Sequence, residues 1–208
     1  MTLEREAQLE MAVRHLEAAD PVLGSVIVQV GACTLTPHTR YFEELAGSVI
    51  GQQLSVKAAA TITARVEGLF DGTFPGPQAL AAANREDLRA AGLSYRKVDY
   101  IQDLATKVAA GAVVLDHLDA LTDTEIIARI TEVKGFGTWT VQMFLIFSLG
   151  RLDVVASGDL GVRTGVKRLY SLETLPAPKD VEERAQANRW HPYSSVACWY
   201  LWQSLNNS

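Results

Sequence analysis

The chain has 208 residues, 48% of them hydrophobic, which is enough apolar content for one globular body or two small subdomains that share an interface. The net charge of −5 gives no sign of a polyanionic partner, and no apolar run reaches the roughly 20 residues that a membrane span needs. The two cysteines, Cys33 and Cys198, exclude a four-thiolate zinc or iron–sulfur site built from this chain alone. We therefore expect a soluble, cytoplasmic chain without an iron–sulfur cluster.

Helical periodicity dominates the sequence. Alanine-rich amphipathic stretches predict helices over residues 6–19, 41–70, 77–91, 95–110, 123–132 and 139–149. Residues 26–30 form a short apolar run that fits a β-strand, a helical turn or a buried connector. Glycine and proline fall at short connections, and no internal repeat is present. The sequence therefore predicts an all-α fold.

A Gly-x-Gly turn joins two of these helices in the sequence VKGFGTWT, residues 133–140. Gly135 and Gly137 permit positive φ and close approach of another group, and the N–H groups that open the second helix suit a phosphate oxygen. Such a hairpin can hold a DNA backbone without reading its sequence. Taken alone, the Gly-x-Gly turn fits an ordinary helix connection as well.

Asp159 lies farther along the chain in the sequence VASGDLGVR, residues 155–163. Its position predicts the start of a helix, where its carboxylate would accept backbone N–H bonds. An ionised carboxylate is also the group that stabilises a cationic transition state. From spacing alone, a plain helix cap and a catalytic residue are both open.

These two segments resemble the helix-hairpin-helix, Gly/Pro-rich loop and aspartate signature of the HhH-GPD DNA glycosylase superfamily. Three more motifs resemble its 3-methyladenine DNA glycosylase II (AlkA-type) branch in the same order: IGQQLS at residues 50–55, AGLSYRK at residues 91–97 and WHPYSSVA at residues 190–197. The resemblance spans about residues 41–205. The longer enzymes of this branch carry an additional N-terminal β-rich domain, for which the first 40 residues are too short, so we expect the compact form.

The resemblance implies one glycosylase core over residues 1–208, made of two helical subdomains that flank a cleft. The first would be a helical barrel over residues 40–149, with the helix-hairpin-helix at residues 125–148. The second would combine residues 1–39 with residues 150–208. We expect the protein to act as a monomer.

The resemblance also implies a role for each matched residue. Asp159 would be the catalytic carboxylate. Gln53, or its neighbour Leu54, would be the wedge that fills the space left by a flipped nucleotide. The aromatic residues that would line the base pocket are Trp139 and Tyr193, with Trp190 close to the second.

The hairpin would bind the DNA backbone and a cation. The carbonyls of Thr131, Val133 and Gly135 match positions that hold a monovalent ion, Na⁺ or K⁺, between protein and phosphate. The expected DNA-backbone contacts are Lys134, Gly135, Gly137, Thr138 and, in the helix after Asp159, Lys167. Two positions depart from the branch: Lys134 replaces a common proline, and Ser194 replaces a usual arginine.

The reaction follows from one more matched position. Bifunctional members attack the sugar with a lysine at the place of Trp139, so this chain is predicted to hydrolyse the N-glycosidic bond without strand cleavage. A cationic alkylated purine, such as 3-methyladenine or 7-methylguanine, would suit the aromatic pocket. The partner would be double-stranded DNA with damaged bases, no cofactor would be required, and the protein would lie at the nucleoid in a bacterium or in the nucleus of a eukaryote.

Three other functions stay open at this point. A non-catalytic protein that binds damaged DNA through the hairpin would not need Asp159. A bifunctional glycosylase with lyase activity would need a lysine near the second hairpin helix, where Trp139 stands. A helical scaffold that recognises proteins would make the hairpin glycines accidental.

Overall fold

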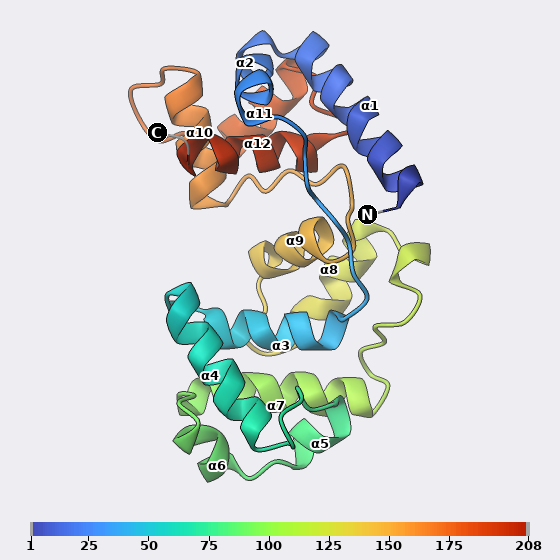
Figure 1. The fold of residues 1–208 in the computed structure, drawn as a ribbon, viewed down its shortest axis with the longest axis vertical. Helices are drawn as coiled ribbons and strands as arrows, with labels where there is room; N and C mark the ends of the chain where they lie inside the picture. The colour runs from blue at the N-terminus through green and yellow to red at the C-terminus, as the bar shows by residue number, and fades with distance from the viewer. Residues whose placement is uncertain (1, 207–208) are drawn as a thin grey trace. The chain divides into compact units, whose positions relative to one another are not determined.

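The computed structural model describes residues 2–206, and within this range it contains twelve α-helices, one short 3-10 helix and no strand (Figure 1). The all-α prediction is confirmed. No helix in the described range is long and apolar enough to cross a membrane. The chain divides into two compact units, one made of Met1–Pro37 and Leu145–Ser208 and the other of His38–Phe144.

Unit 1 is built around its C-terminal helix. It contains α1 (Leu3–Ala19), α2 (Pro21–Val30), α10 (Leu160–Leu169), α11 (Pro178–Ala187) and α12 (Ser194–Asn206). The first eight residues of α12 are all buried, and this helix packs against α1, α2 and α10. A helix that is buried on all sides in this way forms the centre of a core.

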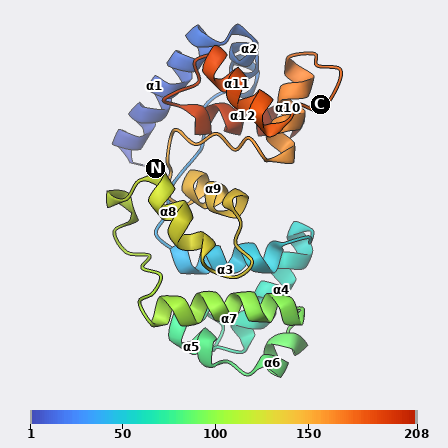
Figure 2. The same cartoon turned by 180° about the vertical axis from the view of Figure 1, so that it is seen from behind.

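Unit 2 is built around α7. It contains α3 (Tyr41–Gly51), α4 (Val56–Gly68), α5 (Pro77–Ala82), α6 (Arg85–Ala90), α7 (Tyr95–Ala109), the 3-10 helix η1 (Leu118–Ala120), α8 (Asp123–Thr131) and most of α9 (Thr138–Phe147). Figure 2 shows α7 running along α5 and α6, and it also packs against α3. Its buried face is formed by Val98, Ile101, Leu104 and Ala105.

Two stretches that the periodicity predicts as single helices are each divided in two. Residues 41–70 break between α3 and α4, where Gln53 has a φ of 60° and the Ser55 hydroxyl accepts the Ala58 N–H. Residues 77–91 break between α5 and α6, where Asn84 Oδ1 accepts the Glu86 N–H at 2.8 Å. In both cases a side-chain cap starts a new helix inside an apolar pattern that continues across the break.

The apolar run at residues 26–30 is the end of helix α2. Asp20 caps this helix by accepting the Val22 and Leu23 N–H groups, each at 3.1 Å, and Pro21 occupies the first turn. Leu23, Val26 and Ile27 are buried together because residues three and four apart share a helix face.

Candidate functional site

Asp159 is the N-cap residue of α10, as the sequence predicts. Its Oδ1 accepts the backbone N–H of Val162 at 2.8 Å and the indole N–H of Trp202 at 2.7 Å. The residue is half-buried, and these two donors hold one of its carboxylate oxygens. A carboxylate held in this way has a fixed orientation before any ligand binds.

Trp202 reaches Asp159 because α10 and α12 approach each other closely. A Cβ on Gly161 would lie 2.7 Å from Trp202 Cδ1 and 3.0 Å from Asp159 Oδ1, and a Cβ on Gly165 would lie 3.0 Å from the Leu201 carbonyl oxygen. Glycines four residues apart form one smooth helix face that permits this approach. Sequence reasoning missed Trp202: the spacing of Gly161 and Gly165 after Asp159 indicates that another helix approaches closely, but it does not indicate which residue of that helix meets the carboxylate.

Tyr193 lies half-buried in the turn that leads into α12, with its ring edge-on to His15 at 5.2 Å between ring centres. Asp153 holds this turn: its Oδ1 accepts the Ser194 hydroxyl at 2.7 Å, and its Oδ2 bonds to His191. Where the branch usually has arginine, Ser194 therefore keeps a polar contact through its hydroxyl group.

Trp190 is a core residue and not part of a base pocket. It is 0% exposed, and its indole N–H donates to Asp20 Oδ2 at 2.8 Å. The same oxygen accepts the Asn188 side-chain amide at 2.7 Å and the Tyr170 hydroxyl. A base cannot stack on a ring that is enclosed in this network, so the expected pocket role of Trp190 is corrected.

The predicted hairpin lies in unit 2, between the end of α8 at Thr131 and the start of α9 at Thr138. Gly135 has a φ of 84°, and a Cβ there would lie 2.1 Å from Tyr100 Cδ2. Only a glycine fits this position without strain. Gly137 has no atom within 4 Å of an added Cβ, so its lack of a side chain is not required by packing within the chain.

The surface of the hairpin is exposed. Lys134, Gly135, Gly137 and Thr138 are open to solvent, and Trp139 is 49% exposed at the start of α9. The remaining predicted backbone contact, Lys167, belongs to unit 1 and lies in the last turn of α10, at the opposite end of that helix from Asp159. The four hairpin residues that are predicted to contact the DNA backbone are thus all accessible to solvent.

Two of the predicted cation-binding carbonyls already accept hydrogen bonds. The Gly135 carbonyl accepts the Gln52 side-chain amide at 3.2 Å, and the Val133 carbonyl accepts the Phe136 N–H at 3.2 Å. Because a carbonyl oxygen has two lone pairs, each can still coordinate an ion. The predicted wedge residues Gln53 and Leu54 are both exposed in the turn between α3 and α4.

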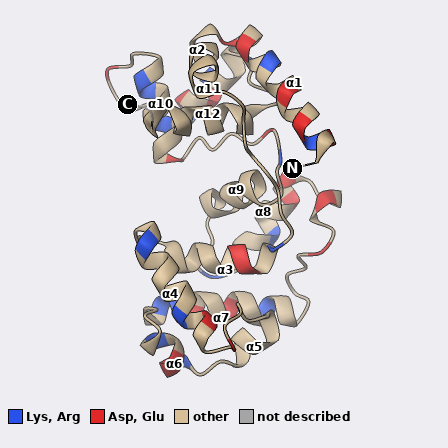
Figure 3. Cartoon of the chain, viewed as in Figure 1, with Lys and Arg blue, Asp and Glu red and all other residues tan. Residues whose placement is uncertain are grey.

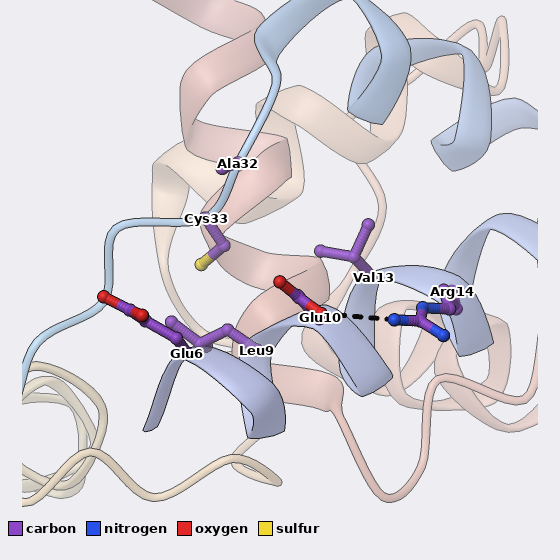
Figure 4. Close-up of a pocket in the computed structure, with 7 residues that line it drawn as sticks. All are labelled: Glu6, Leu9, Glu10, Val13, Arg14, Ala32 and Cys33. Carbon is purple, nitrogen blue, oxygen red and sulfur yellow. Dashed lines mark hydrogen bonds and ion pairs between the residues drawn. The ribbon is translucent and has the colours of Figure 1, made fainter. Parts of the chain in front are cut away.

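A cavity of about 440 Å³ in unit 1 contains none of the predicted site residues. It is lined by α1 side chains and by Ala32 and Cys33 (Figure 4). Burial raises the pKa of the Cys33 thiol to about 11, so this sulfur is protonated at neutral pH and is a poor nucleophile.

Charges of both signs are spread over both units (Figure 3). The described residues contain no cluster of three or more His, Cys, Asp and Glu side chains that could hold a metal ion.

Comparison with known proteins identifies relatives over most of the chain. DNA-3-methyladenine glycosylase 1 of Schizosaccharomyces pombe is 36% identical over 165 residues, which cover 78% of this chain and 72% of that protein. The structure of S. pombe 3-methyladenine DNA glycosylase in complex with abasic DNA has a TM-score of 0.84 at 33% identity, covering 94% of this chain and 97% of that one. A Bacillus halodurans DNA-3-methyladenine glycosidase structure has a TM-score of 0.83 at 38% identity, covering 93% and 88% of the two chains.

The profile of the HhH-GPD superfamily base excision DNA repair proteins matches residues 46–190, a range that includes the turn between α3 and α4, the hairpin and Asp159. The chain belongs to the HhH-GPD superfamily of base excision DNA repair proteins.

Proposed function

We propose that this protein is a monofunctional DNA glycosylase that removes alkylated purines from damaged double-stranded DNA. The observation that carries the proposal is the carboxylate of Asp159, held at the start of α10 by the Val162 N–H and the Trp202 indole. The relatives support it, since those at 33–38% identity are named as 3-methyladenine DNA glycosylases or glycosidases and one was solved with abasic DNA.

Asp159 would act on the sugar of a nucleotide turned out of the duplex. As the bond between C1′ and the base nitrogen breaks, positive charge develops on the sugar, and a fixed carboxylate stabilises that charge. The bonding electrons leave with the base. A water molecule then forms the new C1′–oxygen bond and gives up a proton, for which Asp159 is the candidate acceptor.

Aromatic rings would bind the base, namely those of the exposed Trp139 and the half-buried Tyr193. An alkylated purine such as 3-methyladenine or 7-methylguanine carries a positive charge, which the faces of Trp139 and Tyr193 attract with about 0.5–2 kcal/mol each. The same charge makes the base a good leaving group without an acid. Trp139 stands where bifunctional members have their lysine, so no side-chain amine is expected to attack the sugar there.

The hairpin would hold the DNA backbone. The N–H groups of the exposed residues at the start of α9 and the Lys134 ammonium suit phosphate oxygens. The carbonyl oxygens of Thr131, Val133 and Gly135 are hard donors of the kind that bind Na⁺ or K⁺, and such an ion would add positive charge facing a phosphate. No other cofactor is needed for this chemistry.

Base release from a panel of duplexes tests the proposal. We expect release of 3-methyladenine and 7-methylguanine, and no covalent complex when borohydride is added to trap a Schiff base. Release of uracil alone would overturn the substrate class, and a trapped complex would overturn the monofunctional reaction. Binding to an abasic-site analogue without release of any base would favour the non-catalytic alternative.

A further inference from the structure

One face of α7 contacts both of the elements proposed to touch DNA in unit 2. Lys97, Tyr100, Asp103 and Lys107 follow one another at spacings of three and four residues, so their side chains share a helix face. The first of them contacts residues 50–52, which lead into the wedge loop, defined here as residues 52–55. The other three contact the hairpin at residues 132–135.

Lys97 closes the end of α3. Its Nζ donates to the carbonyl oxygens of Ile50 and Gln52, each at 2.8 Å. An ammonium group is favourable at a helix C-terminus, where the last carbonyls have no partner in the helix. Burial, together with repulsion from Arg96, lowers the pKa of Lys97, but the two carbonyls still offer good acceptors for its charged form.

The wedge loop needs a contact of this kind. Gln53 has a φ of 60°, a left-handed conformation that an L side chain rarely adopts, and the residue is exposed. Such a conformation persists only where the surrounding structure holds it. The two carbonyls that Lys97 binds include the one directly before Gln53, so the ammonium fixes the peptide from which the turn starts.

The hairpin is attached to the same helix face. Asp103 Oδ2 accepts the Lys134 N–H at 2.9 Å, and Lys107 Nζ donates to the Glu132 carbonyl at 2.6 Å. The Tyr100 ring lies in the space left by Gly135. A direct bond joins the two elements as well, because the Gln52 amide donates to the Gly135 carbonyl at 3.2 Å.

We propose that Lys97 is a positioning residue that holds the wedge loop in register with the hairpin, so that the wedge enters the duplex while the hairpin binds the backbone. The proposal rests on the proposed function, because it assumes a base-flipping protein. Lys97 itself would touch neither the base nor the sugar. Its effect would pass through the backbone of residues 50–53.

The test measures wedge insertion without base release. A duplex carries a stable abasic-site analogue and an adjacent 2-aminopurine, whose fluorescence rises when it is unstacked. Lys97→Met keeps the length of the side chain and removes the charge, and Lys97→Arg restores a donor. The matched control is Lys107→Met, on the same helix face, which loses the bond to the Glu132 carbonyl in the hairpin and the ion pair with Asp103 in α7, but no contact with residues 50–55.

We expect Lys97→Met to weaken the insertion equilibrium roughly tenfold or more, as loss of charge-assisted hydrogen bonds predicts. Lys97→Arg should recover part of it. Adding Gln53→Ala to Lys97→Met should weaken insertion little further, because Lys97 and Gln53 act through the same loop. Adding Gln53→Ala to Lys107→Met should weaken insertion by its full effect, because Lys107 does not act through that loop. Thermal unfolding identifies variants that do not fold, in which case Lys97→Gln, which keeps an uncharged NH2 donor on a shorter side chain, replaces Lys97→Met.

Three results would count against the proposal. If Lys97→Met inserts the wedge as well as the unmodified protein does, this proposal is overturned but the base-flipping function is not. Full additivity of Lys97→Met with Gln53→Ala has the same consequence. Absence of any fluorescence rise with the unmodified protein overturns both this proposal and the base-flipping function. Failure to release alkylated bases, with a normal fluorescence response, overturns only the proposed reaction.

Discussion

The indole N–H of Trp202 in α12 donates to Oδ1 of Asp159, the residue that begins α10, at a distance of 2.7 Å. The Phe147 ring packs on the same indole, with 5.3 Å between ring centres. The carboxylate thus depends on a side chain 43 positions later in the sequence for its orientation. Asp159 and Trp202, which no sequence motif connects, are therefore linked directly by a hydrogen bond.

Trp202→Phe tests this dependence. The variant keeps an aromatic ring and loses the donor, and a hydrogen bond to a charged group contributes about 1.5–3 kcal/mol. We expect single-turnover base release to fall by roughly tenfold to a hundredfold, since each 1.4 kcal/mol is a factor of ten. Affinity for an abasic-site analogue should change little, and a parallel loss of affinity and release would contradict a positioning role.

Gly161→Ala tests the close approach that brings Trp202 to Asp159. The added methyl group would lie 2.7 Å from the indole and 3.0 Å from the carboxylate, so one of the two must move. We expect slower base release in a protein that still folds, because the far end of a side chain can shift. Gly158→Ala, which meets nothing within 4 Å, is the matched control and should release base normally. Equal rates in both variants would show that this contact is unimportant.

The part of the site that sequence could predict is local. Asp159 begins a helix because its neighbours along the chain supply the N–H groups, and the hairpin lies between two helices because Gly135 adopts a positive φ there. Trp202 could not be assigned in the same way. Its role depends on the packing of α10 against α12, and a tryptophan near the end of an apolar helix has no feature that separates a core residue from a partner of Asp159.

Gly135→Ala tests the conformation of the hairpin. A side chain there requires a strained φ and would overlap the Tyr100 ring, at 2.1 Å from Cδ2. We expect a loss of stability of roughly 1 kcal/mol or more and weaker binding to any duplex, damaged or not. The urea midpoint and the affinity for undamaged DNA measure the two effects. Gly137→Ala should leave the midpoint nearly unchanged, and an equal loss there would contradict the assignment of the strain to Gly135.

Asp20 gives the expected pH dependence of stability. Burial acts to raise its pKa, but hydrogen bonds from Tyr170, Trp190 and Asn188 and from the Leu23 N–H outweigh it, and the pKa lies below its ordinary value of 3.8. The pKa of Asp20 is therefore lower in the folded protein than in the unfolded chain. For this reason the charge of Asp20 stabilises the fold when the pH is above 3.8, and this stabilisation is lost as the pH falls through the pKa of the folded state.

Urea unfolding between about pH 6 and about pH 3 checks this behaviour. We expect Asp20→Asn to be less stable than the unmodified protein at about pH 6. The asparagine amide has only one oxygen, and its NH2 group is a donor that cannot accept the bonds from Tyr170, Asn188 and Trp190. The difference should shrink at the lower end. A difference that is constant across this range would show that the charge of Asp20 does not contribute.

The errors in predicting the fold have the same origin as those in predicting the site. Periodicity identified apolar faces but not the capped breaks at Ser55 and Asn84, since a small polar residue inside a pattern also fits a continuing helix. The sequence predicts Trp190 near the pocket only because it lies three residues before Tyr193. Its contact with Asp20, from the other end of the chain, puts it in the core instead.

Asp159→Asn provides the most direct test of the catalytic role. The amide is nearly the same size as the carboxylate but cannot stabilise a positive sugar or accept a proton from water. We predict that single-turnover release of 3-methyladenine falls by roughly a hundredfold or more, while affinity for an abasic-site analogue stays nearly the same. Release at the rate of the unmodified protein, or a loss of affinity that accounts for the whole loss of release, would contradict the account.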